Sequence, residues 1–231
     1  MSNSYDDFLR RFILYRTGMN MSQEDMGKLL GKTQSQLSKI ELRKTVVPFD
    51  MLESLQSIGW DVDDMIIGKE QIILESRLTD YLIENAGKNW KALKELVVWI
   101  IGLEFQKCGG FPDADSECEY QLLKTLLYSE DSKTVMLAVR NVMGIRQDVM
   151  AERLGVDVKK CRDLERGRIY PDAELLILIY EMCSCRPTVF FQHENTEGYL
   201  LDCLWNRLDI KWQKQAKTIL DDVIRVIGHD W

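Results

Sequence analysis

The sequence repeats one pattern of chemically specific positions, first near the N-terminus and again past the middle of the chain. Six residues of segment 12–65 recur in segment 136–190, each 124 positions further along. The pairs are Arg16 and Arg140, Gln23 and Gln147, Met26 and Met150, Leu30 and Leu154, Gly31 and Gly155, and Glu41 and Glu165. A constant spacing over charged, polar, apolar and glycine positions predicts that one structural unit occurs twice.

Each copy has the sequence features of two short helices joined by a tight turn. In the first copy, Ser22 is suited to cap a helix with an acidic first turn, and Gly31 is suited to end it in the left-handed conformation. Thr33 then caps the next helix. In the second copy, Gly155 is the expected stop and Asp157 the expected cap. We therefore expect a helix-turn-helix in both copies.

Both copies resemble the Cro and phage-repressor type of helix-turn-helix. Residues 22–41 and residues 146–167 look like the second helix, turn and recognition helix of that family. The resemblance implies a DNA-binding transcriptional regulator of the XRE family, with recognition helices at 33–42 and 157–166. On this basis we predict a repressor that binds double-stranded DNA.

An arginine precedes a glutamate by 25 positions in both copies, as Arg16 with Glu41 and as Arg140 with Glu165. The family that these residues resemble uses such a pair to join its first helix to the end of the recognition helix. Ion pairs of this kind are commonly structural. We therefore predict two structural ion pairs and assign neither of them a catalytic role.

The first recognition helix presents polar side chains that suit contacts with DNA. Glutamine and lysine match the edges of adenine and guanine in the major groove, and the resemblance implies base contacts by Gln34, Ser35 and Lys39. Gln23 and Thr33 are suited to hold phosphates at helix starts. The residues expected to bind DNA are Gln23, Thr33, Gln34, Ser35, Gln36, Ser38, Lys39, Arg43 and Lys44 in the first copy, and Gln147, Lys159, Lys160 and Arg162 in the second.

The second recognition helix departs from the commoner polar pattern, because it carries Val158, Lys159, Lys160, Arg162 and Asp163. A carboxylate can accept a hydrogen bond from cytosine but repels a phosphate. Two interpretations therefore stay open for the second copy. It is either another DNA contact or a surface for dimerisation or a protein partner, since a fold alone does not determine its function.

The net charge of −7 opposes a nucleic-acid partner unless the charge is unevenly distributed. Residues 22–47 carry five cations and three anions, and residues 145–171 carry seven cations and five anions. Both segments are thus mildly basic within an acidic chain. This distribution favours a regulator with small DNA contacts and excludes a histone-like protein that coats nucleic acid.

A weaker repeat follows each expected helix-turn-helix and predicts a helical hairpin. Its members are Leu78, Asp80, Leu82 and Trp90, which recur as Leu200, Asp202, Leu204 and Trp212. Long helical periods, four prolines and almost no alternating pattern indicate an all-α fold. We predict an internal duplication with these parts: helix-turn-helix domains at 1–68 and 131–191, a helical hairpin with a linker at 69–130, and a C-terminal hairpin at 192–231.

Residues 96–103 are apolar all the way round a helix but too short to span a membrane. We expect this helix to be buried on every side, between the two halves of the chain or between two chains. Residues 212–227 instead have the period of an amphipathic helix, and residues 108–119 are the expected linker. One chain with two copies can supply both halves of an asymmetric operator, but we favour a homodimer that forms around Trp99.

The remaining features of the sequence limit which functions the protein can have. The six cysteines lack zinc spacing, and the chain has only two histidines, His193 and His229, so buried free thiols are expected in place of a metal or redox site. A sensor disulfide between Cys108 and Cys118 is the alternative. No catalytic constellation, cofactor motif, membrane segment or targeting peptide is evident, which predicts a cytoplasmic protein that is not an enzyme.

Two other functional interpretations stay open. One is a protein-interaction module on a helix-turn-helix scaffold, such as an antitoxin or an anti-repressor. The other is a regulator that responds to a small-molecule, peptide or protein effector bound among four tryptophans, Trp90, Trp99, Trp205 and Trp212, although aromatic residues at helical spacing are more commonly core residues.

Overall fold

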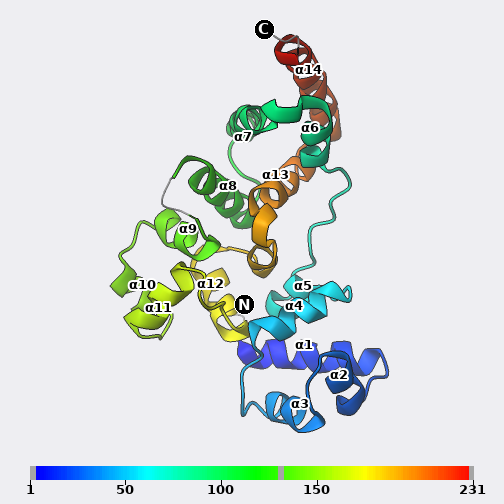
Figure 1. The fold of residues 1–231 in the computed structure, drawn as a ribbon, viewed down its shortest axis with the longest axis vertical. Coiled ribbons are helices and arrows are strands. Elements are labelled where there is room, and N and C mark those ends of the chain that lie inside the picture. The colour runs from blue at the N-terminus through cyan, green and yellow to red at the C-terminus, as the bar shows by residue number, and fades with distance from the viewer. Residues whose placement is uncertain (1–3, 130–132, 229–231) are drawn as a thin grey trace. The chain divides into compact units, whose positions relative to one another are not determined.

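The computed structural model describes residues 4–129 and 133–228 and consists of helices and their connections throughout this part of the chain (Figure 1). The all-α prediction is confirmed. The helices form two compact units, each built from two separate segments. Unit 1 comprises Met1–Gln71 and Met143–Phe191, and unit 2 comprises Ile72–Val142 and Gln192–Trp231.

This division brings together segments that are far apart in the sequence. Most of both expected helix-turn-helix segments lie in unit 1, and the expected hairpin segments lie in unit 2 apart from residues 69–71. The helix α9 (Val135–Val142), which was expected to open the second helix-turn-helix, belongs to unit 2. Its apolar face packs there against α8 (Ala114–Tyr128). The four consecutive domains drawn from the sequence stay a prediction.

The first segment of unit 1 forms five helices around an apolar core. They are α1 (Tyr5–Gly18), α2 (Gln23–Leu29), α3 (Gln34–Glu41), α4 (Phe49–Ser57) and α5 (Val62–Ile67). Phe8, Phe12 and Leu37 are among the side chains fully buried in this core. The turn between α2 and α3 needs a left-handed residue, and Gly31 supplies it with φ +62°.

The second segment of unit 1 contains α10 (Gln147–Arg153), α11 (Val158–Glu165), α12 (Ala173–Cys183) and the 3₁₀ helix η2 (Pro187–Phe191). The helices α10 and α11 begin and end 124 positions after α2 and α3. Gly155, between them, has φ +64°. The offset that relates the repeated residues therefore also relates the helix bounds.

A joint connects the two segments of unit 1. The helices α12 and η2 pack against α5, and α12 also contacts α1 (Figure 1). The backbone N–H of Ala173 donates to the carbonyl oxygen of Val47 at 3.1 Å. The ring of Phe49 stacks on Tyr170 and on Phe191, with 4.6 Å between ring centroids in both cases. These contacts hold the start of α12 against the start of α4.

Asp63 of α5 is the polar centre of this joint and is fully buried. Its carboxylate accepts hydrogen bonds from the backbone N–H of Thr188 at 3.0 Å and from the Thr188 hydroxyl at 2.8 Å. The Arg186 guanidinium lies 3.4 Å from the same carboxylate. Burial raises the pKa of Asp63 to about 6, and the hydrogen bonds from Thr188 and the charge of Arg186 oppose that rise.

Unit 2 is built around α13 (Thr196–Asn206), which is buried along most of its length. It lies between α8 and α6 (Leu78–Ala86), and it also contacts α7 (Trp90–Lys107) (Figure 1). Asp202 of α13 accepts from the backbone N–H of Thr79 at 2.9 Å, at the start of α6. Short 3₁₀ turns, η1 (Gly87–Asn89) and η3 (His193–Asn195), and the C-terminal helix α14 (Ile210–Gly228) complete the unit.

Two expectations about unit 2 need correction. The helix at 96–103 is not buried on every side within one chain, because Trp99 is 63% exposed and Leu103 45% exposed, and its burial between two chains stays a prediction. The segment 108–119 is not a linker throughout, because α8 begins at Ala114 with Asp113 as its cap. The acidic residues belong to the first turns of that helix, where the helix dipole favours negative charge.

The helix α14 has the amphipathic pattern expected from the sequence, with Ala216 and Leu220 buried. Its apolar side is only partly covered, since Ile219 is 55% exposed. The side chain of Ile227 and the whole of His229 lie outside the described residues. No helix in 4–129 or 133–228 has the length and apolar character needed to cross a membrane.

Candidate nucleic-acid interface

A capping box stabilises the start of each helix in the pair α2–α3. The Ser22 hydroxyl accepts from the Asp25 backbone N–H at 3.1 Å. The Ser22 hydroxyl and the Ser22 backbone N–H both donate to the Asp25 carboxylate, which lowers the pKa of Asp25. The Thr33 hydroxyl accepts from the Gln36 N–H at 3.2 Å, while Gln36 Oε1 accepts from the Thr33 N–H at 2.8 Å. Satisfied helix starts hold α3 in a defined position against α2.

Arg16 and Glu41 form a two-pronged ion pair between α1 and the end of α3. Arg16 Nε lies 2.7 Å from Glu41 Oε1 and Arg16 Nη2 lies 3.2 Å from Oε2, with each side chain only 10% exposed. Arg16 Nη1 also donates to the Met21 carbonyl oxygen at 2.6 Å. Gln23 Nε2 donates to Glu41 Oε2 at 2.8 Å. One carboxylate thus joins α1, α2 and α3.

This network affects the predicted role of Gln23 on a phosphate. The amide nitrogen of Gln23 donates one N–H to Glu41 inside the fold, so its other amide N–H and its backbone N–H are the donors that it can offer to a phosphate. Phosphate contact by Gln23 stays a prediction. A helix start remains suited to it, because its first N–H groups have no partner within the helix.

The exposed side of α3 carries the residues predicted to contact bases. Gln34, Ser35 and Lys39 are exposed, whereas Leu37 and Ile40 are buried on the opposite side. Gln36 is exposed but its oxygen is held by the capping box, and Ser38 is half-buried. The α3 surface therefore offers amide, hydroxyl and ammonium groups from a helix whose other side is packed.

Most cations of the first copy are paired with a carboxylate. Arg43 Nη1 lies 2.6 Å from Asp6, Lys32 lies 2.7 Å from Asp50, and Lys28 lies 2.7 Å from Glu24. Lys39 and Lys44 are exposed, and neither forms an ion pair with any residue in the described part of the chain. Among the cations predicted to bind DNA, Arg43 must therefore break its ion pair with Asp6 before it can bind a phosphate.

The pair α10–α11 repeats part of this network with different surface residues. Gln147 Nε2 donates to Glu165 Oε2 at 2.6 Å, and Glu165 is buried. Asp157 accepts from the Lys160 N–H at 2.7 Å as the cap of α11. Arg140, the predicted ion-pair partner of Glu165, lies on α9 in unit 2, and their pairing stays a prediction.

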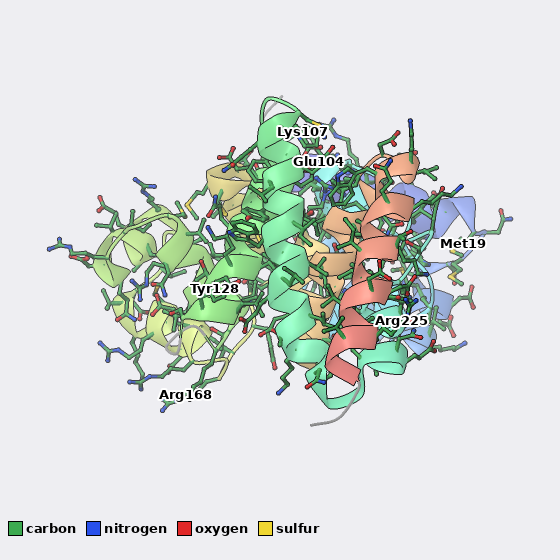
Figure 2. All side chains as sticks on the ribbon, turned by 90° about the horizontal axis from the view of Figure 1, so that it is seen from above. Met19, Glu104, Lys107, Tyr128, Arg168 and Arg225 are labelled. Carbon is green, nitrogen blue, oxygen red and sulfur yellow. The ribbon has the colours of Figure 1, made fainter. Side chains whose placement is uncertain are left out.

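The exposed side of α10–α11 is rich in cations. Lys159 and Arg162 are exposed and Lys160 is half-buried. Asp163 is paired with Arg168, at 3.2 Å. Figure 2 shows side chains tipped with nitrogen projecting outward from this helix pair, with Arg168 at its edge. The helix α11 therefore carries three cations where α3 carries one.

Cys118, Cys161, Cys185 and Cys203 are buried, and Cys108 is exposed. Burial raises the pKa of the Cys203 thiol well above its usual range, which keeps this thiol protonated. Among the described residues, no group of three or more histidine, cysteine, aspartate or glutamate side chains is placed to hold a metal ion.

The four tryptophans do not share one environment. The rings of Trp205 and Trp212 lie 5.9 Å apart, Trp90 lies beneath the Lys94 ammonium group, and Trp99 is exposed. An effector held among all four stays a prediction with no contact in its support.

The comparisons with known proteins bear on the first copy alone. No curated protein and no solved structure matches the chain. Residues 13–57, which run from α1 through α4, match the sequence profile of a helix-turn-helix family of the Cro/C1 type. The first helix pair is therefore a helix-turn-helix of the kind found in DNA-binding regulators.

Proposed function

We propose that the protein is a transcriptional repressor that places α3 in the major groove of a specific operator. The observation that carries this proposal is the combination of an exposed polar surface on α3 with the buried Arg16–Glu41 pair that fixes α3 from behind. A preformed recognition helix loses little conformational entropy on binding. The family match over residues 13–57 supports the same conclusion.

The side chains of α3 divide into two roles in this proposal. Gln34, Ser35 and Lys39 contact base edges, for which an amide and an ammonium group are suited. Thr33, Gln36, Ser38, Arg43 and Lys44 lie around them and contact the sugar-phosphate backbone, which positions the helix without sequence preference. Occupied operator DNA is then closed to the transcription machinery.

The proposal includes an internal duplication, in which α10–α11 is a second copy of α2–α3. Three observations support it: the common offset of the helix bounds, the positive φ of Gly31 and Gly155, and the hydrogen bond from Gln147 to Glu165, which matches that from Gln23 to Glu41. The exposed residues of the two copies differ, whereas these internal residues are the same in both. This is expected when two copies share a fold but not a function.

The proposal also includes a homodimer formed through unit 2. The helix α14 carries an incompletely covered apolar seam with a spacing of seven residues, at Trp212, Ile219 and Val226. Such a spacing is typical of helices that pair along their length. Figure 2 looks onto α14 and α7, on which Arg225, Glu104 and Lys107 are labelled. Trp99 on α7 is another exposed apolar side chain of unit 2.

The charges of α14 favour a second copy of this chain as the occupant of that seam. Its first half is basic, with Lys211, Lys214 and Lys217, and its second half begins with Asp221 and Asp222. Two α14 helices in antiparallel contact about Ile219 place the basic half of each beside the acidic half of the other. A two-fold contact of this kind is self-complementary.

Light scattering tests the homodimer. We expect twice the chain mass of 27.0 kDa for the wild type and a return to 27.0 kDa for Ile219→Asp. Ile73→Asp is the matched control, because Ile73 is exposed outside any helix. A wild-type mass of 27.0 kDa at all concentrations would remove the dimer from the proposal.

A fluorescence-anisotropy titration against the DNA of the protein's own promoter region tests the function. We expect specific binding that weakens steeply as salt rises. Gln34→Ala should reduce specific affinity by about 5- to 150-fold, the value of one good side-chain contact to a base. Gln106→Ala, at an exposed glutamine of α7 in unit 2, is the matched control and should bind like the wild type.

Two outcomes contradict the proposal. Binding that does not distinguish the promoter from a scrambled duplex excludes a sequence-specific regulator. No binding at any salt concentration moves the function to a protein-interaction module or to a regulator that needs an effector, and a search for the partner follows.

A further inference from the structure

We propose that α10–α11 is a clamp for the phosphate backbone of the duplex that α3 recognises, and that it contacts no bases. This inference rests on the proposed DNA-binding function and assigns the second helix pair a distinct task within it. It follows from three observations: the identity of the residues at matching positions, the pairing of the cations, and the joint within unit 1.

The positions that contact bases in the first copy carry different chemistry in the second. Gln34, Ser35 and Lys39 correspond, 124 positions later, to Val158, Lys159 and Asp163. A valine has no hydrogen-bonding group in its side chain, so it replaces the amide with an apolar contact at most. The ammonium group of Lys39 becomes a carboxylate, which is held by Arg168.

Cations occupy the positions around these changed residues. Four residues of the first copy, namely Leu29, Gln36, Ser38 and Leu42, correspond to Arg153, Lys160, Arg162 and Arg166. Three of these four cations are exposed, and Lys160 is half-buried. Uncharged residues around the α3 surface are thus replaced by positive charge around α11.

These cations are also free to bind a phosphate. Within residues 4–129 and 133–228, five cations of the second copy form no ion pair with a carboxylate. They are Arg153, Lys159, Lys160, Arg162 and Arg166. In the first copy, three of five cations do so: Lys28, Lys32 and Arg43. A cation without a carboxylate partner releases condensed counterions from DNA with no ion pair to break first.

The joint within unit 1 connects the two helix pairs, as simultaneous binding to one duplex requires. The N–H of Ala173 donates to Val47 and the Phe49 ring stacks on Tyr170, so the chain that leaves α11 is held against the first copy. Once α3 is bound, binding by α10–α11 is intramolecular. It then benefits from a high effective concentration without a large binding area of its own.

A cation surface that binds only phosphates has a defined thermodynamic signature. The logarithm of the binding constant falls with the logarithm of salt concentration by about 0.9 for each phosphate neutralised. Removing such a cation weakens binding to every sequence by a similar factor and reduces this slope. Removing a side chain that reads a base instead lowers the ratio of specific to non-specific affinity.

The test is a salt series with the full-length variant Lys159→Ala/Lys160→Ala/Arg162→Ala on promoter DNA and on a scrambled duplex of equal length. We expect weaker binding to both by the same factor, an unchanged ratio between them, and a salt slope that is lower by about 0.9 for each phosphate no longer neutralised. The substituted side chains are not in the apolar core, so the thermal unfolding of the variant should match the wild type.

A matched variant controls for net charge. Lys91→Ala/Lys124→Ala/Lys133→Ala removes three exposed cations from unit 2 outside α14, and we expect it to keep the wild-type salt slope. An equal reduction of the slope in this control would overturn the clamp, because overall charge would then explain the effect.

Other outcomes separate the clamp from the proposed function. If the wild type binds specifically and depends on Gln34 but the triple variant at 159, 160 and 162 binds like the wild type, the clamp is wrong and the function stands. A fall in the specificity ratio at unchanged slope would show that α11 reads bases. If the wild type binds no DNA, the proposed function and the clamp both fail.

Discussion

The pairs α2–α3 and α10–α11 have the same internal hydrogen bond and the same glycine turn, yet their exposed surfaces differ in kind. Gln23 donates to Glu41 in the first pair and Gln147 donates to Glu165 in the second. Outside, Gln34 corresponds to Val158. Buried contacts determine whether two helices hold their angle, whereas exposed side chains determine what the surface binds. Two surfaces on one backbone plan can therefore serve different tasks.

The ion pair that supports α3 should show the greatest effect on stability. Arg16→Ala leaves the buried Glu41 carboxylate without its main counter-charge and should lower the free energy of unfolding by about 3–5 kcal/mol. Urea denaturation monitored by circular dichroism measures this change. Arg140→Ala, measured alongside, compares the two copies, and a similar decrease would support the predicted second ion pair. A decrease below about 1 kcal/mol for Arg16→Ala would contradict a structural role.

The next effect concerns the joint that holds the two copies together. The pKa of Asp63 is raised in the folded state from 3.8 to about 6, so folding favours the protonated carboxyl. The stability that protonation contributes is fully present below about pH 4 and is lost as pH rises through about 6, by about 3 kcal/mol in total. Asp63→Asn keeps an acceptor for the Thr188 N–H without a titrating group.

Unfolding free energies of the wild type and Asp63→Asn between about pH 4 and about pH 7 test this expectation. The wild type should lose stability relative to the variant across that interval. Parallel curves would show that Asp63 does not titrate there. The joint distinguishes the copies, because the position 124 residues after Asp63 is Pro187 and has no carboxylate.

A weaker effect is expected from the caps of the two recognition helices. Thr33→Ala and Asp157→Ala each remove a side chain that accepts from a backbone N–H, and each should cost about 1 kcal/mol of stability. Their effects on DNA binding should be opposite. Thr33→Ala removes a group that binds a phosphate, whereas Asp157→Ala removes an anion from the basic surface. Weaker binding by Asp157→Ala at equal folded fraction would contradict the clamp.

Exposed ion pairs should matter least. Arg168→Ala breaks a pair with Asp163 in the second copy, and Asp6→Ala breaks the pair with Arg43 in the first. Exposed pairs contribute about 0.2–1 kcal/mol, so both variants should unfold nearly as the wild type does. Asp6→Ala should strengthen DNA binding because it releases Arg43. A change in stability above about 2 kcal/mol in either variant would show a role beyond the surface pair.

The sequence predicted the local structure well but predicted the solvent exposure of side chains poorly. Ser22, Thr33 and Asp157 cap helices where they were expected to, and Gly31 and Gly155 occupy the turns. Caps and left-handed glycines act within a few residues, so their signals are visible in the chain. Trp99 is not buried within one chain, because the helices next to α7 cover only one side of it, and its burial between two chains stays a prediction.

The joint was not visible in the sequence. Asp63 lies more than 120 positions from Arg186 and Thr188 along the chain, and none of the three belongs to the repeated pattern. An aspartate inside the apolar run of α5 was the only available signal, because a buried carboxylate needs a partner somewhere. The sequence does not say where that partner is.

Local signals in the chain were enough to establish the all-α class, the limits of α2, α3, α10 and α11, and the first helix-turn-helix, because capping, glycine conformation and helical period are properties of neighbouring residues. The folded arrangement was needed to show that both helix pairs share unit 1, that α13 is the buried helix of unit 2, and that Trp99 is exposed. Those outcomes depend on which apolar surfaces meet, and the helical period of a segment shows that one side packs without showing which distant segment it packs against.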